Sequence, residues 1–330
     1  MEPIKITIAC QNYDRIRPLM DGRVRIEGCN SIVLPMKPDE SFFRAFGSAE
    51  FEVTELSAAS TLMSVDRGKD FPYVAVPVFP SRMFRHSAIY IRTDSGIKQP
   101  SDLRGRKIGI PEYQMTVGLW ARGLLSDLHG VRAEELKWRT GGLETSGRKE
   151  KTPLNLPPQF EIEPIPAGAT LSSMLVDGGI DALISAIRPS CWGKAPNVAR
   201  LFPNYRAAEE EYYRQTKVFP IMHMLGVRKD LVAQYPWLPA SVVKAFEQAK
   251  AMSMVDMEEF GTFNVTLPWL MSEIEATKEL MGEDYWSYGV EPNRKALETL
   301  IRYAHEQGMI SRRLEVEELF AKSTLRQVKV

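Results

Sequence analysis

Short apolar segments alternate with amphipathic segments along most of this chain, and this alternation constrains the fold more than any other feature. Residues 4–9 (IKITIA) alternate β-branched and polar side chains, as a strand does. KIGI at 107–110 precedes a loop and a helical pattern that ends near His129, and residues 172–186 give a helix, a Gly-rich turn and a strand. Strands that alternate with helices predict an α/β fold with largely parallel pairing.

The same patterns predict further elements. We expect strands at 23–34 and 51–57, the second followed by a loop, and a buried strand at 73–79 that Pro80 closes. Residues 40–48 (ESFFRAFGS) predict a short helix with its three phenylalanines on one face. Residues 237–255 and 291–310 predict long amphipathic helices.

Composition excludes several classes of protein. The 330 residues are 44% hydrophobic and contain 22 Gly and 22 Pro, which is typical of a globular chain. Lys and Arg together number 42 and so do Asp and Glu, so the basic excess of a nucleic-acid-binding protein is absent. No stretch reaches the roughly 20 apolar residues of a membrane helix. At the start, MEPIKITIAC, Glu2 replaces the basic start of a secretory signal and polar residues interrupt the apolar run. Three cysteines without a CxxC pair also predict a cytoplasmic location.

Several motifs with known chemistry are missing. The sequence has no GxGxxG or GxxxxGK[ST] segment for a nucleotide and no GxSxG elbow for a nucleophilic serine. It has no HExxH and no cluster of His and Cys, so we expect no zinc site. A zinc site built from His and Asp side chains that converge only in three dimensions stays open.

A family resemblance emerges from longer segments. DLRGRKIGIP at 102–111 resembles the entry into the second lobe of type-II periplasmic binding proteins. Five further segments, in order along nearly the whole chain, resemble the 4,5-dihydroxyphthalate decarboxylase family: NYDRIRPLMDGRVRIEG, RMFRHSAIYIRTDSGI, PEYQMTVGLWARGLL, KWRTGGLETSGRKEK and NRKALETLIRYAHEQG.

The resemblance implies a two-lobed α/β fold with a ligand cleft between the lobes. Lobe 1 would comprise 1–93 plus 214–330, and lobe 2 would comprise 94–213. It also implies a carboxy-lyase that acts on a small aromatic dicarboxylate. The missing export signal favours an enzyme over a transport receptor. Homo-oligomerisation stays open.

Four residues are candidates for proton transfer. His86 follows two arginines at the predicted lobe crossing, where a histidine can exchange a proton near neutral pH. Asp14 and Glu55 follow strands at the edge where cleft residues gather, although Asp14 also suits a helix cap. His223 lies in an apolar strand and either lines the site or is a hydrogen-bonded core residue.

Arginine is the natural clamp for a carboxylate because its planar fork donates two parallel hydrogen bonds. Arg188 is the first candidate, since it leaves the strand DALISAI beside the predicted cleft, and Arg82 and Arg85 come next. The other candidates for substrate binding have hydroxyls or backbone N–H groups near a strand end or a helix start: Ser57, Tyr113, Gln114 and Thr116.

The chemistry that the resemblance implies needs no cofactor. A hydroxyl para to the departing carboxylate lets the aromatic ring accept the electrons, so the protein supplies a base, an acid and a clamp. We assign the acid–base work to His86 with Asp14 or Glu55, with His223 as a substitute, and the clamps to Arg188 and Arg82. The alternatives are a non-catalytic cytoplasmic binding protein for an aromatic acid or a pyrimidine-like ligand, and another lyase or hydrolase.

Overall fold

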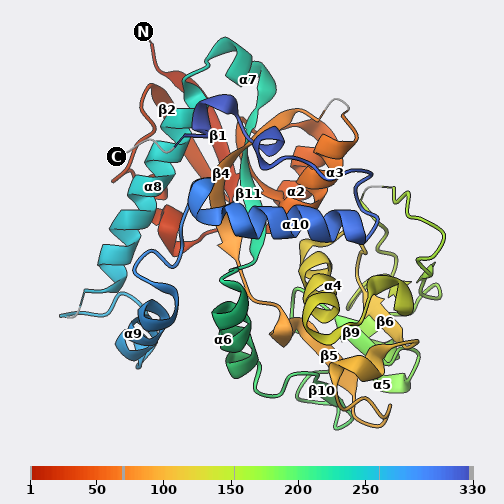
Figure 1. The fold of residues 1–330 in the computed structure, drawn as a ribbon. Coiled ribbons are helices and arrows are strands. Elements are labelled where there is room, and N and C mark those ends of the chain that lie inside the picture. The colour runs from red at the N-terminus through yellow and green to blue at the C-terminus, as the bar shows by residue number, and fades with distance from the viewer. Residues whose placement is uncertain (1, 69–70, 152, 260, 327–330) are drawn as a thin grey trace. The chain divides into compact units, whose positions relative to one another are not determined.

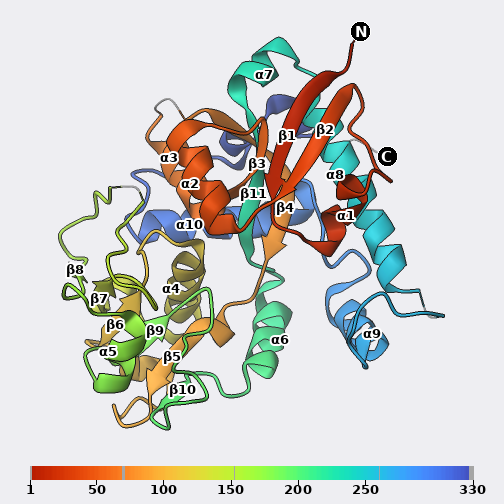
Figure 2. The same cartoon turned by 180° about the vertical axis from the view of Figure 1, so that it is seen from behind.

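The computed structural model describes residues 2–68, 71–151, 153–259 and 261–326. The chain forms two compact units (Figures 1 and 2). The first contains residues up to Arg82, His223–Glu298 and the residues from Leu314 onward, and the second contains Met83–Met222 and Thr299–Arg313. Each unit has one mixed β-sheet with helices packed on it, which confirms the predicted α/β class.

The first unit contains a five-stranded sheet in the order β2-β1-β3-β11-β4. β1 is parallel to both β2 and β3, whereas β11 is antiparallel to β3. Figure 2 shows β1 and β2 side by side at one edge of this sheet. The strands are β1 (Ile4–Cys10), β2 (Cys29–Pro35), β3 (Val53–Ser57), β4 (Tyr73–Arg82) and β11 (Ile221–Arg228).

The helices of this unit include a 20-residue helix, α8, that packs against β4 and α1. Ile6 and Ile8 of β1 are buried, as their alternation predicts. The helices are α1 (Arg17–Met20), α2 (Pro38–Ser48), α3 (Ala58–Asp66), α7 (Lys229–Gln234), α8 (Leu238–Met257) and α9 (Leu270–Met281).

The second unit contains a six-stranded sheet in the order β10-β5-β9-β6-β7-β8. β6 is parallel to β7 and β9, and β7 is parallel to β8, so the carboxyl ends of these strands share one edge. The strands are β5 (Ile89–Arg92), β6 (Lys107–Ile110), β7 (Lys137–Thr140), β8 (Ile162–Pro164), β9 (Ala182–Ile184) and β10 (Val198–Arg200). Its helices are α4 (Thr116–His129), α5 (Leu171–Asp177) and α6 (Tyr205–Thr216), and α10 (Arg294–Glu306) begins in the first unit and ends in the second.

Four local predictions were wrong. β2 begins at Cys29 rather than at 23, because Gly28 turns the chain with φ +76°. The three phenylalanines of α2 do not share one buried face: Phe43 is 72% exposed, because consecutive residues of a helix point in different directions and Phe42 is buried. β4 continues through Pro80, which an edge strand tolerates. β3 leads directly into α3, because Ser57 caps that helix.

The boundaries between the two units fall at other residues than the predicted lobe limits of 93/94 and 213/214. The divisions follow Arg82 and Met222, and Met83 N–H donates to Pro220 O (3.1 Å) within the second unit. Residues 299–313 join the second unit because Gln307 accepts a hydrogen bond from buried Arg122 of α4 (2.6 Å).

Candidate active site

A fully buried carboxylate, that of Glu55, lies near the carboxyl end of β3. It accepts hydrogen bonds from the Tyr13 hydroxyl (2.7 Å) and the Gln11 N–H (3.0 Å), and the Cys10 thiol faces it at 3.5 Å. β1 and β3 are parallel, so the segment that follows β1 reaches the same edge of the sheet as the end of β3. The sheet itself therefore assembles the donors around Glu55.

His223 joins this carboxylate from β11, the antiparallel neighbour of β3, where it lies opposite Ser57. Its Nδ1 donates to Glu55 Oε1 at 2.5 Å, and its ring meets the edge of Phe42 at 4.9 Å between centroids. Nε2 makes no hydrogen bond with any described residue, and the side chain is 16% exposed. A carboxylate on Nδ1 fixes the tautomer, so Nε2 is the nitrogen available to a ligand.

The electrostatics of the cluster separate its members by role. Burial raises the pKa of Glu55, but the charge of His223 and the hydrogen bonds from His223, Gln11 and Tyr13 outweigh it and hold that pKa below its usual value. Burial, reinforced by the charge of Glu55, raises the pKa of the Tyr13 phenol and of the Cys10 thiol well above their usual values. Tyr13 and Cys10 therefore keep their protons and hold Glu55 in place as an anion.

Arg15 is stacked beside this cluster. Its guanidinium lies 4.3 Å from the centroid of the Tyr13 ring and 4.0 Å from that of Trp286. It donates to the Pro80 carbonyl (2.9 Å) and pairs with Asp14 (2.8 Å), whose side chain is 43% exposed. The structure thus places Asp14 in an ion pair with Arg15 and shows no hydrogen bond from it to Glu55 or His223.

A groove of about 210 Å³ lies beside the same arginine. Aromatic and sulfur-containing side chains form much of its wall, with one acidic and one basic group at the η1 turn (Asp14–Ile16). The residues that line it include Asp14, Arg15, Met254, Ile274, Tyr285 and Trp286. Its composition suits a planar apolar group.

Several residues predicted to bind substrate follow two parallel strands of the second unit, β6 and β9. Arg188 lies after β9, is exposed, and makes no hydrogen bond or ion pair with the residues that the structure describes. Gln114 and Thr116 lie between β6 and the first turn of α4, and both are buried. These residues therefore share the edge of the sheet where ligands of α/β proteins bind.

The structure does not favour the predicted roles of His86 and of the Tyr113 hydroxyl. His86 is 2% exposed, and its ring lies 5.1 Å from that of Phe202 and 5.6 Å from that of Tyr212. Burial lowers the pKa of His86 to about 4, so it is neutral at pH 7 and a poor acid. The Tyr113 hydroxyl is buried as well and donates to the Gln307 carbonyl (3.4 Å).

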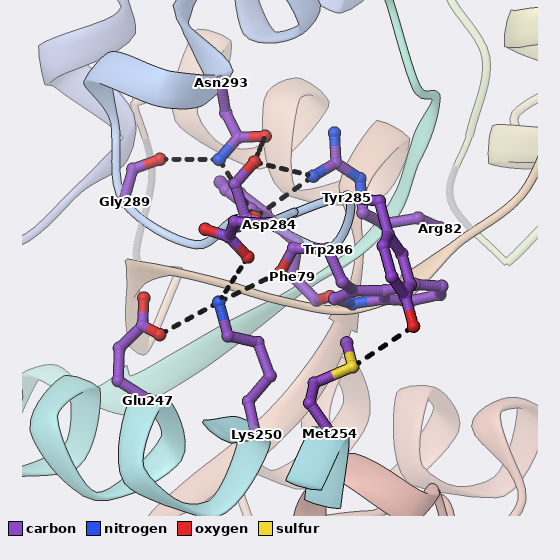
Figure 3. Close-up of polar contacts among 11 residues, drawn as sticks. Phe79, Arg82, Glu247, Lys250, Met254, Asp284, Tyr285, Trp286, Gly289 and Asn293 are labelled. Carbon is purple, nitrogen blue, oxygen red and sulfur yellow. Dashed lines mark hydrogen bonds and ion pairs between the residues drawn. The ribbon is translucent and has the colours of Figure 1, made fainter. Parts of the chain in front are cut away.

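The remaining three predicted residues make structural contacts. Arg82 is buried and donates to the Ser287 carbonyl (3.1 Å), in the network of Figure 3 that also joins Trp286 Nε1 to the Phe79 carbonyl (3.1 Å). Arg85 is buried with its Nε 3.0 Å from the sulfur of Met222. Ser57 accepts from the Ser60 N–H (3.4 Å) at the start of α3.

Sequence reasoning missed Tyr13, and it missed the pairing of Glu55 with His223. Tyr13 lies one residue before Asp14, so the same signal, a polar residue after a strand, would have selected it. Sequence reasoning also missed Glu112 and Glu150, which both accept hydrogen bonds from the turn before α4. Glu150 accepts the Tyr113 N–H (2.6 Å), and Glu112 accepts from the side-chain amide of Gln114 (3.3 Å). Nothing in the sequence spacing indicated that Glu150, which lies in the loop after β7, reaches this turn.

Two further questions are whether a helix could span a membrane and whether side chains are grouped to bind a metal ion. None of the helices in ranges 2–68, 71–151, 153–259 and 261–326 combines the length and hydropathy needed to cross a bilayer. Within the same ranges, no three His, Cys, Asp or Glu side chains are grouped to hold a metal ion.

Comparison with known proteins gives the class and then the family. No family model matches the chain. The solved structure of the periplasmic aliphatic sulphonate binding protein SsuA from Escherichia coli superposes with a TM-score of 0.55, at 12% identity, over 98% of this chain and all of the other. The fold is therefore that of the periplasmic-binding-protein-like proteins.

Two curated relatives are much more similar in sequence. The 4,5-dihydroxyphthalate decarboxylase of Comamonas testosteroni is 43% identical over an alignment of 331 positions that covers the whole of both chains. That of Pseudomonas putida is 45% identical over 215 residues, covering 65% of this chain and 83% of its own. The chain belongs to the 4,5-dihydroxyphthalate decarboxylase family, as its sequence segments predict.

Proposed function

We propose that this chain decarboxylates 4,5-dihydroxyphthalate to protocatechuate and CO2, and that His223 supplies the proton. The names of the two relatives support the substrate. The observation that carries the catalytic part is the contact of His223 Nδ1 with the buried Glu55 carboxylate, which leaves Nε2 without a partner among the described residues. A buried carboxylate stabilises the imidazolium and orients it, as general acid catalysis requires.

The reaction consumes one proton. A base takes the proton of the hydroxyl para to the departing carboxylate, and the phenoxide pushes electrons onto the ring carbon that bears it. Nε2–H of the His223 imidazolium protonates that carbon and gives a dienone. The C–C bond then breaks, its electrons restore the aromatic ring, and CO2 leaves. The phenoxide regains its proton, and the neutral imidazole takes one from solvent.

This assignment replaces His86, which sequence reasoning placed first. His86 is neutral at pH 7 because burial lowers its pKa to about 4, whereas His223 keeps a carboxylate partner and one free nitrogen. Tyr13 and Gln11 act as positioning residues, because they donate hydrogen bonds to Glu55 and not to the imidazole of His223. Arg188 remains the proposed clamp for the retained carboxylate, since its exposed guanidinium has no partner among the described residues.

The proposal includes no metal and no organic cofactor, because the ring accepts the electrons. It also includes a cytoplasmic location, in keeping with three cysteines that are free: Cys10, Cys29 and Cys191.

The test is turnover by the purified chain. With 4,5-dihydroxyphthalate we expect CO2 and protocatechuate, and in heavy water one deuterium at the vacated ring carbon. Tight binding without product would contradict the proposal and support a non-catalytic binding protein.

His223→Asn tests the role of the histidine. Asn keeps a donor toward Glu55 but cannot exchange a proton near pH 7, so kcat should fall by about 10²-fold or more while phthalate still binds. His305→Asn, at an exposed position of α10, is the matched control and should leave kcat unchanged. Near-normal turnover by His223→Asn would remove His223 from the mechanism.

A further inference from the structure

The loop between β7 and β8 places one of its own carboxylates on the turn that leads into α4. Oε1 of Glu150 accepts the N–H of Tyr113 at 2.6 Å, and Oε2 accepts the N–H of Gln114 at 3.5 Å. Two successive backbone N–H groups, each on a different oxygen of one carboxylate, form an anion-binding nest. The turn follows β6 at the carboxyl edge of the parallel strands, where a ligand of this fold binds.

The same turn also binds the loop through a second carboxylate. Glu112 is 1% exposed and accepts from Nε and Nη2 of Arg148, both at 2.7 Å. It also accepts the Lys151 N–H at 3.1 Å, and the Lys151 ammonium lies 3.8 Å away. Glu112 thus anchors the loop, whereas Glu150 fills the nest.

A buried positive charge lies next to this nest. Arg122 is 1% exposed, and it donates hydrogen bonds to neutral groups of the described residues: Gln307 Oε1 at 2.6 Å, the Tyr113 carbonyl at 2.8 Å and the sulfur of Met309 at 3.5 Å. In the described structure its Nη1 has no hydrogen-bond partner. A buried guanidinium without a carboxylate in direct contact favours an anion nearby.

Glu150 is weakly held as an anion. Burial, together with the negative charge of Glu112, raises the pKa of Glu150 to about 7, although the N–H groups and Arg122 oppose this shift. A carboxylate that is half protonated near neutral pH gives up its place more readily than a fully ionised one.

We propose that the N–H groups of Tyr113 and Gln114, beside Arg122, bind one carboxylate of the substrate, and that Glu150 occupies this site as an internal competitor until substrate displaces it. The inference rests on the proposed function for the identity of the ligand. Glu150 thereby becomes a residue that determines the affinity for aromatic dicarboxylates.

The size of the effect follows from occupancy. When a site is open for only a fraction of the time, the apparent Kd of its ligand equals the intrinsic Kd divided by that fraction. A 10-fold decrease of KM on removal of Glu150 corresponds to an occupancy of the nest by Glu150 of about nine-tenths. kcat is unaffected, because Glu150 has left the site in the enzyme–substrate complex.

The experiment compares Glu150→Ala and Glu150→Gln with the parent chain. We expect Glu150→Ala to lower KM about 10-fold at constant kcat, and Glu150→Gln to lower it less, since an amide oxygen still accepts an N–H. Phthalate, which lacks the hydroxyls, should bind about 10-fold more tightly to Glu150→Ala in calorimetry. Glu163→Gln, a 59% exposed glutamate of β8 that pairs with Arg139, is the control and should change neither constant.

Hydrogen exchange gives a second measurement that does not depend on catalysis. Saturating phthalate should protect the amides of Tyr113 and Gln114 and expose those of residues 144–151. Unchanged or weaker phthalate binding by both Glu150 variants, or protection of residues 144–151 by phthalate, would overturn the inference. A parent chain that binds phthalate in this way but forms no product would refute the proposed function and leave the inference standing.

Discussion

Glu55→Gln is the most informative change, because it keeps the shape of the buried group and removes only its charge. The one oxygen of the amide is needed by the Gln11 N–H, which can only donate. The NH2 group then faces Nδ1 of His223 and the Tyr13 hydroxyl, which both donate in the parent chain. To avoid two opposed donors, His223 must take the other tautomer, with its proton on Nε2 and without a carboxylate to stabilise the imidazolium.

The contacts of Glu55 set the magnitude. Hydrogen bonds to an ionised group contribute about 1.5–3 kcal/mol and those to a neutral group about 0.5–1.5 kcal/mol. We expect Glu55→Gln to lower the free energy of unfolding by about 1–3 kcal/mol at pH 7 and to lower kcat by about 10²- to 10⁴-fold.

The pH dependence has a definite sign. Because the folded-state pKa of Glu55 lies below the ordinary value of 4.5, its charge stabilises the fold above pH 4.5, and this contribution is lost as the pH falls through the folded-state pKa. The part of the stability difference between the two chains that comes from the charge of Glu55 should therefore shrink below pH 4.5.

The assay combines steady-state decarboxylation with denaturant unfolding at pH 7 and at pH 4. Glu27→Gln is the control, since its side chain is 79% exposed and pairs only with Lys244 among the described residues, at 3.5 Å. A Glu55→Gln chain with parental kcat would refute the reasoning, because the buried pair would then have no part in proton transfer.

Three further predictions follow from the same structure. His86→Asn should leave kcat within about threefold, and a 100-fold loss of kcat would restore His86 as the acid. As the pH falls from 6.5 to 4, the parent should lose roughly 3 kcal/mol of its free energy of unfolding, because only the unfolded chain protonates His86 in that range. Unfolding titrations of His86→Asn should not show this loss. Arg188→Lys should raise KM about 10- to 150-fold through loss of the two-pronged donor, while Arg132→Lys, at a 63% exposed position, should do little; equal effects would exclude Arg188 as a clamp. Activity should survive dialysis against EDTA, and loss with recovery on adding a divalent ion would show a metal requirement.

Local patterns were sufficient for most of the individual elements. The alternation in IKITIA predicted β1, and the apolar spacing before Gly130 predicted the end of α4 at His129, since Gly130 adopts φ +63°. The patterns failed where a neighbour decides the outcome. Pro80 ends a strand by its own chemistry, yet β4 tolerates it because it lies at the edge of the sheet.

The sequence by itself determined the α/β class, the family and the types of residue that could exchange protons or bind a carboxylate. Only the tertiary structure decided which of them meet. Glu55 and His223 are 168 positions apart, and the antiparallel pairing of β3 with β11 brings them to 2.5 Å. Burial likewise distinguishes the two histidines, which sequence reasoning ranked in the opposite order. Packing against the rings of Phe202 and Tyr212 desolvates His86 and lowers its pKa, whereas the carboxylate of Glu55 faces His223.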